Sequence, residues 1–478
     1  MNITIDAREC GAGKTHGPKG TLARITNIRM VDEKVIISLP SIDLAKDYQK
    51  QFPEARVINS SEITGKVVES VINSMILGVE VIIITHQALL MAEIPTALKM
   101  EYNLVIDEAF DPWKCVEINR EDTDNLIQWD KFIDIIEMTD GSYMKVRLGN
   151  LSTNEIYASH HKIRSLQSSN YDTYIHVDFV EVDSHNNLKL NQKALDTVKM
   201  AFFQELRHDF FSGFQSLHVA AAYFTDTLLS HWMNYAKMKF NVVEKPEKHD
   251  KSVVFHIPDY EQIHKYHTRS DGKTPKFEWS KNKRTGSMKF FLDQYHEYLF
   301  QQVGTDYLFL RNLDCDESLG LDEYRLKHNS AGSNDYAHMR NVSLESTLNP
   351  SKWFYSFLNT RCSNSDDVLL AGHSVYVAIT GYTYYQSLMR SYLRVDDWDS
   401  NDRVNIFLID ERAWLYLSGL FSNFEVVEYS ITYPDTWGKK KKTALTGPQR
   451  RQATYLRKKY PEDKELDARA ILIKYKKM

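Results

Sequence analysis

The stretch Asn2 to Thr15, NITIDARECGAGKT, decides the fold of this 478-residue chain. Its first half alternates apolar and polar residues, with Ile3, Ile5 and Ala7 on one side, which predicts a short buried strand. A glycine-rich turn, Gly11-Ala12-Gly13-Lys14-Thr15, follows at once. Such a turn after a strand points several backbone N–H groups inward and forms a cradle for an anion.

The side chains of this turn are those that bind a nucleoside triphosphate. Lys14 would reach the β- and γ-phosphates, and the hydroxyl of Thr15 would hold Mg²⁺. The strict pattern also requires a glycine five residues before Gly13, where this sequence has Arg8, so the match is incomplete. The alternative is a plain tight turn, and a carboxylate at the end of a later buried strand would decide between the two.

Composition places the chain among globular proteins, with room for two or three domains. Hydrophobic residues make up 42% of it and aromatic residues 12%. Its apolar runs are shorter than the ~20 residues of a membrane helix, and its start lacks the basic-then-apolar order of a signal peptide. Four cysteines without metal-ligand spacing are typical of reduced thiols, so we expect a cytoplasmic protein that does not contact a membrane.

Positive charge is concentrated at the end of the chain. Residues 439–478 hold 14 Lys/Arg and 4 Asp/Glu, a net charge of +10 in a chain whose total is −5. A basic run with Trp437 and several tyrosines nearby suits neutralisation of nucleic-acid phosphates together with base stacking. A solvated basic helix without a partner is the alternative.

Strands and helices alternate along the first 110 residues, which predicts a doubly wound α/β sheet. The expected strands are 34–39, 56–59, 79–85 and 103–106. The expected helices begin near Thr21, after the N-cap Ser41 and at Lys66.

Asp107 and Glu108 follow the strand 103–106 and supply the carboxylates that the glycine-rich turn requires. The end of a parallel strand lies at the same edge of the sheet as the turn, where ligands of α/β sheets bind. Asp107 can hold Mg²⁺, and Glu108 can orient and deprotonate a water that attacks the γ-phosphate. A solvated turn is the alternative for an isolated Asp-Glu pair, and the upstream glycine-rich turn makes it the weaker one.

Taken in order, these features resemble the first RecA-like domain of a superfamily 2 helicase of the DEAD/DEAH type, particularly the compact forms encoded by bacteriophages. Residues 8–15 stand at motif I, and residues 107–110, in the spelling DEAF, stand at motif II. Residues 37–45 resemble the family's PTRELA motif, and residues 84–90 resemble the nucleic-acid motif that follows it.

The resemblance implies ATP and Mg²⁺ as ligands, and nucleic acid as a partner. The residues it assigns to the nucleotide are Gly11, Ala12, Gly13, Lys14 and Thr15, with Thr15 and Asp107 on the metal. Those it assigns to nucleic acid in this half are Pro40, Ser41, Thr85 and His86.

Residues 111–214 are not required by such a core, so we expect an insertion there. Its pattern predicts helices over 130–138, 151–166 and 193–207 and a strand over 173–182. The strand expected at 216–222 stands at motif III, where alanines replace the family's hydroxyl-bearing residues.

A polar, charged stretch over 241–251 predicts a linker to a second domain. The strands expected in that domain are 253–255, 306–311, 341–345, 374–379, 404–408 and 424–429, and one helix is expected at 288–303. Residues 328–335 resemble motif V, which implies phosphate contacts by Gly332 and Asn334.

The stretch from Tyr384 to Arg394 resembles motif VI, with Gln386, Arg390 and Arg394 at four-residue spacing. On a helix that spacing places the three side chains on one face. Two arginines that face a nucleotide from the other domain would act as arginine fingers. An exposed helix with two salt bridges is the alternative.

The sequence therefore predicts an ATP-dependent nucleic-acid helicase or translocase of the α/β class. It would have two RecA-like P-loop domains, 1–240 and 241–430, an insertion at about 111–214 and a basic tail at 431–478. Expected partners are single-stranded or forked nucleic acid, DNA in preference to RNA, and replication proteins. The rivals are a P-loop ATPase that never unwinds, such as an annealing translocase or packaging motor, and a catalytically inactive binding module on the same fold.

Overall fold

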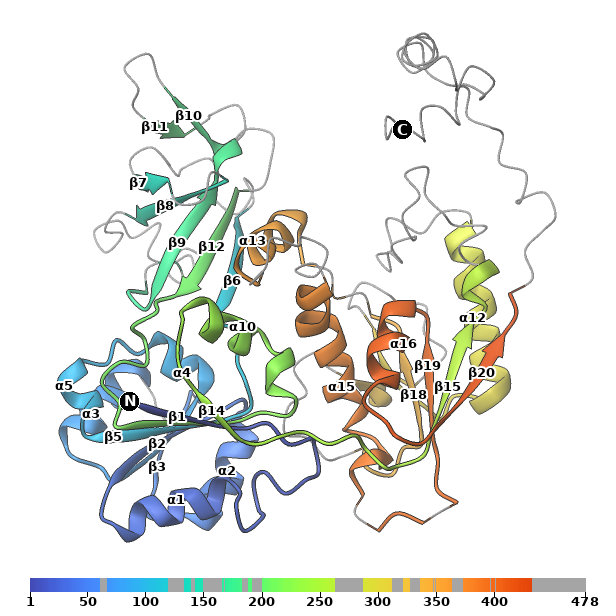
Figure 1. The fold of residues 1–478 in the computed structure, drawn as a ribbon, viewed down its shortest axis with the longest axis horizontal. Helices are drawn as coiled ribbons and strands as arrows, with labels where there is room; N and C mark the ends of the chain where they lie inside the picture. The colour runs from blue at the N-terminus through green and yellow to red at the C-terminus, as the bar shows by residue number, and fades with distance from the viewer. Residues whose placement is uncertain are drawn as a thin grey trace, which may run out of the picture.

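The computed structural model has two α/β halves side by side, with a smaller sheet attached to the first (Figure 1). It describes residues 1–60, 67–118, 133–138, 142–148, 166, 168–182, 188–190, 200–262, 287–311, 321–326, 336–346, 348, 350–362, 373–395, 397–399 and 401–431. Over those residues the first half holds a seven-stranded parallel sheet and the second a six-stranded parallel sheet. The predicted fold class, two parallel sheets flanked by helices with an insertion in the first half, is confirmed.

The sheet of the first half has the strand order β14-β1-β13-β5-β2-β4-β3. Its strands are β1 (Asn2–Asp6), β2 (Lys34–Leu39), β3 (Arg56–Ile58), β4 (Val81–Thr85), β5 (Tyr102–Asp107), β13 (Ser216–Ala220) and β14 (Asn241–Glu244). Its helices include α1 (Thr21–Met30), α2 (Ile42–Gln51), α3 (Val67–Ile76), α4 (His86–Met91), α5 (Thr96–Lys99) and α10 (Leu228–Tyr235). The strands and helices predicted up to residue 106 are confirmed, including the start of α1 at Thr21.

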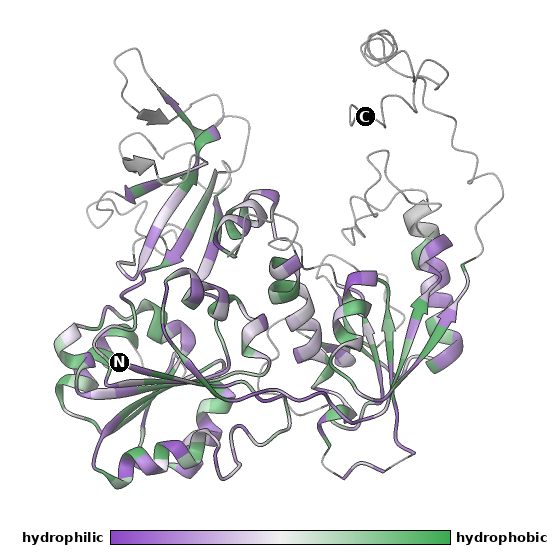
Figure 2. Cartoon of the chain, in the orientation of Figure 1, coloured by the Kyte–Doolittle hydropathy of each residue, from purple (hydrophilic) through white to green (hydrophobic). Residues whose placement is uncertain are grey.

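Helices cover both faces of this sheet, as its apolar strands require. In β2, Val35 and Ile37 pack with α1 and α2, whereas Ile36 lies in the core beneath α3, α4 and α10. Figure 2 shows green on the inner strands of both halves, and green alternating with purple along the outer helices. Because neither face offers water, a polar side chain within the sheet needs a partner, as where Thr4 of β1 lies 3.0 Å from Nδ1 of His218 of β13.

The insertion is an antiparallel sheet with the order β6-β12-β9-β8-β7. Its strands are β6 (Trp113–Ile118), β7 (Ile133–Met138), β8 (Tyr143–Leu148), β9 (Tyr171–His176) and β12 (Met200–Leu206). The predicted strand over 173–182 is divided by a 3₁₀ turn into β9 and β10 (Val180–Val182), and β10 pairs with β11 (Leu188–Leu190).

The helices predicted over 130–138 and 193–207 are wrong where the structure describes them, at 133–138 and 200–207. β7 pairs with β8 there, and β12 is hydrogen-bonded on both sides, by β6 and by β9. Pairing with distant strands overrides the helical pattern, because Ala201 and Phe203 of β12 reach the core of the first half only as alternate residues of a strand. The helix predicted over 151–166 lies outside the described residues except for its last residue.

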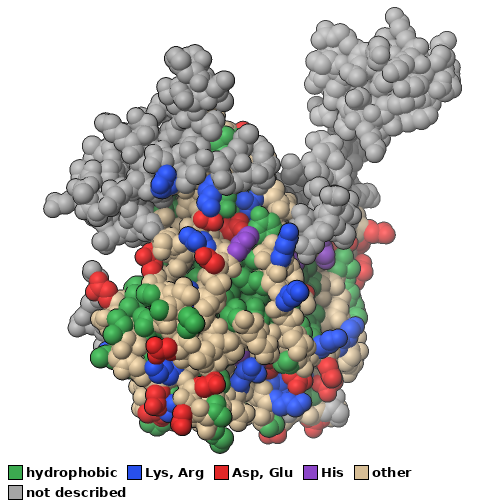
Figure 3. All heavy atoms as spheres, turned by 60° about the vertical axis from the view of Figure 1, so that its left-hand side comes forward, with side chains coloured by type: hydrophobic (Ala, Val, Ile, Leu, Met, Phe, Trp, Pro, Cys, Tyr) green, Lys and Arg blue, Asp and Glu red, His purple; other side chains and the backbone are tan. Residues whose placement is uncertain are grey.

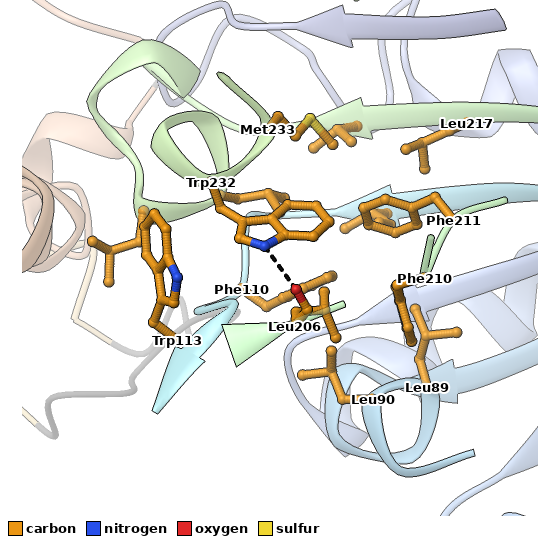
Figure 4. Close-up of a cluster of buried hydrophobic side chains, with 14 of the residues drawn as sticks. Leu89, Leu90, Phe110, Trp113, Leu206, Phe210, Phe211, Leu217, Trp232 and Met233 are labelled. Carbon is orange, nitrogen blue, oxygen red and sulfur yellow. Dashed lines mark hydrogen bonds between the residues drawn. The ribbon is translucent and has the colours of Figure 1, made fainter. Parts of the chain in front are cut away.

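The base of the insertion is packed into the core of the first half (Figure 4). Trp113 of β6 and Leu206 of β12 lie in this cluster with Phe211 and the fully buried Trp232 of α10. The indole N–H of Trp232 donates to the carbonyl oxygen of Leu206 at 2.9 Å. A buried indole needs such an acceptor, so this bond holds the end of β12 on α10.

The sheet of the second half has the order β17-β16-β18-β19-β15-β20. Its strands are β15 (Val253–Pro258), β16 (Leu308–Leu310), β17 (Arg325–Leu326), β18 (Asn341–Leu344), β19 (Val404–Leu408) and β20 (Phe424–Tyr429). The helix α12 (Ser287–Val303) covers one face, and α15 (Tyr382–Leu388) and α16 (Glu411–Ser418) cover the other. The strands predicted at 253–255, 306–311, 341–345, 404–408 and 424–429 and the helix at 288–303 are confirmed. The strand at 374–379 and a single helix carrying Gln386, Arg390 and Arg394 are not, since α15 ends at Leu388.

Two stretches between the halves differ from the sequence prediction. Residues 241–244, predicted as the start of a linker, form β14, which pairs with β1. The strand predicted at 374–379 is wrong, because residues 373–376 and the π-helical turn Val377–Gly381 continue into α15. Its β-branched residues favour a strand locally, but Val375 is buried in the first core and Tyr385 in the second. A helix that is apolar on several sides can place side chains in both cores at once.

Helix α13 (Lys352–Cys362) lies in the sequence of the second half but packs on the first half and its insertion (Figure 1). Phe357 and Leu358 are fully buried in the same core as Trp232. Arg361 forms a buried ion pair with Glu205 of β12, with Nε 3.1 Å from Oε2. This helix, which the sequence analysis did not predict, ties the chain of the second half to the insertion.

The described surface carries charges of both signs. Figure 3 shows Lys and Arg side chains interspersed with Asp, Glu and hydrophobic ones over one face. The basic run 439–478 lies outside the described residues, so its phosphate contacts stay a prediction. No helix in the described ranges is both long enough and apolar enough to pass through a bilayer.

The contact between Cys115 of β6 and Ser351, the residue before α13, predicts that Ser351→Cys forms a disulfide with Cys115. The Sγ atom of Cys115 lies 4.0 Å from the Oγ of Ser351, within reach of a bond after side-chain rotation. Oxidation should remove two thiols per chain and raise the free energy of unfolding by about 2–4 kcal/mol, measured by urea denaturation with and without dithiothreitol. Ser351→Ala is the control, and an unchanged thiol count in the cysteine variant would contradict the docking of α13 on the insertion.

Candidate nucleotide-binding cleft

The glycine-rich turn folds back on itself between β1 and α1. Gly11 and Gly13 have φ of +87° and +72°, a left-handed conformation that residues with a side chain rarely adopt. A Cβ on Gly20 would lie 2.6 Å from the carbonyl oxygen of Lys14, so only glycine fits there. Since α1 begins at Thr21, Lys14 lies on the turn and not in the first turn of the helix.

Arg8 occupies the position of the glycine missing from the strict pattern, and it braces the turn. Its guanidinium donates to both carboxylate oxygens of Asp6, at 2.9 and 2.6 Å, and to the carbonyl oxygen of Ala12 at 3.0 Å. The hydrogen bond to Asp6 raises the pKa of Arg8 even though burial opposes this. Asp6 is 1% exposed, so its carboxylate depends on this two-pronged contact.

Lys14 directs its ammonium group at the backbone of the same turn. Nζ donates to the carbonyl oxygens of Arg8 and Glu9, at 2.9 and 2.7 Å. Both partners are neutral carbonyls, so an anionic phosphate would be a stronger acceptor for the same ammonium.

Asp107 and Glu108 lie at the carboxyl end of β5, as predicted. The carboxylate of Asp107 accepts hydrogen bonds from the Tyr48 hydroxyl at 2.6 Å and the Thr15 hydroxyl at 3.5 Å. Burial raises the pKa of Asp107 to about 6, although the hydrogen bond from Tyr48 opposes the shift. Glu108 has a φ of +68°, and its N–H donates to the carbonyl oxygen of Ala220 at 2.8 Å. Left-handed residues other than glycine are concentrated at functional sites.

The second half contributes Gln386, Arg390 and Arg394, but not from one helix face as predicted. Helix α15 ends at Leu388, and Arg394 lies in the 3₁₀ turn Tyr392–Arg394. Arg390 is 2% exposed, and its Nη2 lies 3.8 Å from Oε1 of Glu108. Burial lowers the pKa of Arg390, and the negative charge of Glu108 acts to raise it. The guanidinium stays charged at neutral pH.

These side chains line one cavity of about 470 Å³ between the halves. The first half contributes Gly11, Gly13, Lys14, Thr15, Asp107 and Glu108, and the second half contributes Gln386, Arg390 and Arg394. Of the predicted nucleotide contacts, only Ala12 is not part of the lining. A cavity of this size is in the range of small-ligand sites.

The chemistry of the lining fits a triphosphate with a divalent cation. Thr15 and Asp107 present oxygen atoms 3.5 Å apart, and oxygen is the donor that Mg²⁺ prefers. The raised pKa of Asp107 reflects a buried negative charge that its surroundings under-compensate, which a bound cation would neutralise. The backbone of the turn, Lys14 and Arg390 supply hydrogen-bond donors for phosphate oxygens.

The residues of the first half predicted to contact nucleic acid lie at the same edge of the sheet and are not part of the cavity lining. Leu39 of β2 pairs with Thr85 of β4, so Pro40 and Ser41 lie near Thr85. Ser41 caps α2 by accepting a hydrogen bond from the N–H of Leu44, and Thr85 caps α4 in the same way. Pro40, Ser41 and Thr85 are half-exposed.

His86 does not fit its predicted role on nucleic acid. It is buried against Phe110, with its Nδ1 2.7 Å from the Ser38 hydroxyl. Burial lowers the pKa of His86 to about 3, so it is a neutral core side chain. Gly332 and Asn334, the other predicted contacts, lie outside the described residues.

Sequence reasoning missed Tyr48, which lines the cavity and donates to Asp107. Burial raises the pKa of Tyr48 well above its usual value, so its hydroxyl keeps the proton it donates. Leu44, Tyr48 and Gln51 recur at the helical spacing of three and four residues and all line the cavity. That spacing was the signal available in the sequence.

The sequence matches no protein-family profile and no curated protein. Among solved structures, Xpd4 of S. tokodaii aligns at 12% identity over 89% of this chain and 96% of that chain, with a TM-score of 0.48. Dbp5 of S. cerevisiae, bound to RNA and ADP BeF3, aligns at 10% identity over 91% of this chain and 86% of that chain, with a TM-score of 0.31. T4 UvsW aligns at 9% identity over 90% of this chain and 74% of that chain, with a TM-score of 0.22. All three TM-scores lie below 0.5, so these alignments carry no argument about activity, and any assignment of activity depends on the geometry of the cleft.

The bracing role of Arg8 predicts that Arg8→Gly, which restores the strict glycine pattern, weakens nucleotide binding. Removing the guanidinium leaves Asp6 buried without its partner, which should cost about 3–5 kcal/mol of folding free energy. The double variant Asp6→Asn, Arg8→Gly should recover part of that loss. Urea denaturation and titration with a fluorescent ATP analogue measure both effects, and tighter binding by Arg8→Gly would contradict this role.

The pKa of Asp107 predicts a pH-dependent stability in the absence of nucleotide and divalent cations. Its pKa is higher in the folded chain than in the unfolded chain, so the folded state binds more protons and loses stability as pH rises. Asp107→Asn removes this penalty. The gain in unfolding free energy over wild type should therefore grow by about 1 kcal/mol from pH 5 to pH 8, measured by urea denaturation. A difference that stays constant over this range would contradict the shift.

Proposed function

We propose that this protein is an ATP-dependent nucleic-acid translocase or helicase, with ATP bound between its two halves. The observation that supports this most is that Lys14 and Asp107 of the first half share one cavity with Arg390 of the second half. A triphosphate bound by Lys14 and Arg390, with its Mg²⁺ on Asp107, would hold the halves together, and its hydrolysis would release them.

Each group has a defined task in this proposal. The glycine-rich turn and Lys14 bind the β- and γ-phosphates, and Thr15 and Asp107 hold Mg²⁺, which neutralises phosphate charge when bound. Glu108 orients the attacking water and accepts its proton. Arg390 and Arg394 stabilise the charge that develops on the γ-phosphate, and Gln386 helps to orient the γ-phosphate.

The polymer we propose is single-stranded or forked DNA, in replication or recombination, as the resemblance to phage-type helicases implies. The half-exposed Pro40, Ser41 and Thr85 would contact its backbone at the edge of the first sheet. The basic run 439–478 would add phosphate contacts. An ATPase that translocates without unwinding, and an inactive binding module, are the two rivals.

ATP turnover should depend on the cleft and not on charge elsewhere. We expect Lys14→Ala and Glu108→Gln to reduce phosphate release to background, and Arg390→Ala to lower kcat by about 10³-fold while nucleotide binding remains. Lys19→Ala and Arg403→Ala are matched controls, because both side chains are exposed and paired with glutamates away from the cavity lining. Turnover near background in wild type, unchanged by these substitutions, would favour the inactive module.

Nucleic-acid dependence separates the remaining rivals. Phosphate release should rise with single-stranded or forked DNA and fall steeply with added salt, because phosphate contacts release counterions. Strand displacement from a forked duplex would identify a helicase, and stimulated turnover without a displaced strand would identify a translocase. Stimulation by RNA alone would contradict the proposed preference for DNA.

A further inference from the structure

The hydroxyl of Tyr385 joins three parts of the chain beside the cleft. It accepts a hydrogen bond from the backbone N–H of Cys10, at the start of the glycine-rich turn, at 2.7 Å. It also lies 3.0 Å from Nε2 of His249, in the connection between the halves. Tyr385 itself belongs to α15, next to Gln386 and five residues before Arg390, which follows the end of the helix.

The hydrogen-bond directions at this junction are set by protonation. Burial lowers the pKa of His249 to about 4, so its ring is neutral at physiological pH and Nε2 can accept. In the tautomer that has its proton on Nδ1, the Tyr385 hydroxyl donates to Nε2 of His249 while it accepts from the N–H of Cys10. Tyr385 is fully buried, so neither partner is readily replaced by bulk water.

The connection between the halves is attached to the same turn. The N–H of Glu247 donates to the carboxylate of Glu9 at 3.0 Å, and the backbone carbonyl of Glu247 accepts from the Tyr223 hydroxyl at 2.7 Å. The ring of Tyr223 meets the ring of Tyr385 edge-on, with centroids 5.0 Å apart. The turn, the connection and α15 therefore form one contiguous cluster.

We propose that Tyr385 is a positioning residue that stabilises the closed cleft, an inference that rests on the proposed function. Cys10 and Tyr385 belong to different halves, so their hydrogen bond forms only when the halves adopt this placement. The same placement brings Arg390 to 3.8 Å from Glu108. The Tyr385 hydroxyl thus ties the phosphate-binding turn to the helix whose end carries the arginines.

The test is Tyr385→Phe, with Tyr384→Phe as the matched control. Both tyrosines are buried on α15, but the Tyr384 hydroxyl donates to the carbonyl of Ser346, within the second half. Tyr385→Phe should raise the Kd of a fluorescent ATP analogue and the KM for ATP about three- to tenfold. This is the effect expected from losing one hydrogen bond that stabilises the closed cleft. Tyr384→Phe should leave both values at wild-type levels.

Alkylation of Cys10 gives a readout that is independent of nucleotide. Its thiol lies 3.9 Å from Oε1 of Gln386, at the contact between the halves. Tyr385→Phe should speed its modification by iodoacetamide several-fold, localised by peptide mass mapping, whereas Tyr384→Phe should not.

The outcomes separate this inference from the proposed function. Wild-type protein that fails to bind the ATP analogue refutes the proposed function, and the alkylation rates still test the Tyr385 contact. Normal binding by wild type, with the two phenylalanine variants equal in Kd, KM and Cys10 alkylation, overturns the inference and leaves the proposed function standing.

Discussion

Both sheets are parallel and covered by helices, and each has a buried carboxylate at the carboxyl end of one of its strands. Two buried carboxylates at such ends behave in opposite ways. At the end of β18, Glu345 accepts from Arg311 at 2.8 Å and lies 3.1 Å from His296. Burial alone would raise its pKa, but His296 and Arg311 overcome that and lower it to about 2. At the end of β5, the pKa of Asp107 stays raised because burial outweighs the hydrogen bond from Tyr48, and a bound cation would offset that burial. This contrast separates a structural ion pair from a group suited to hold a cation.

The halves are joined by more than the connection after β14. Helix α13 returns from the second half to the core of the first, and its buried Arg361–Glu205 pair holds it on the insertion. The helical segment that ends in α15 then passes through both cores, from Val375 in the first to Tyr385 in the second. Its π-helical turn, Val377–Gly381, lies between these two residues, and such turns are frequent at functional sites. Movement of the arginines relative to the glycine-rich turn must therefore bend or shift this segment.

Much of the first sheet and half of the cleft could be read from local signals. The apolar run of β2, the Ser41 cap of α2 and the carboxylates after β5 each depend on neighbours within a few residues. Errors arose where distant partners decide the structure. β12 is a strand because β6 and β9 pair with it, and residues 374–379 are helical because two cores flank them. His86 looked like a surface ligand but is buried beside Phe110.

The sequence by itself determined the two parallel sheets, most of their strands and the residue types of the phosphate-binding turn, since periodicity, capping and glycine conformation are local properties. Only the tertiary structure decided that Arg390 lies 3.8 Å from Glu108, that Tyr48 donates to Asp107, and that Tyr385 holds Cys10. Those contacts join residues far apart in the chain, and their distances depend on how whole sheets and helices pack together. No pattern within a short window of sequence encodes that packing.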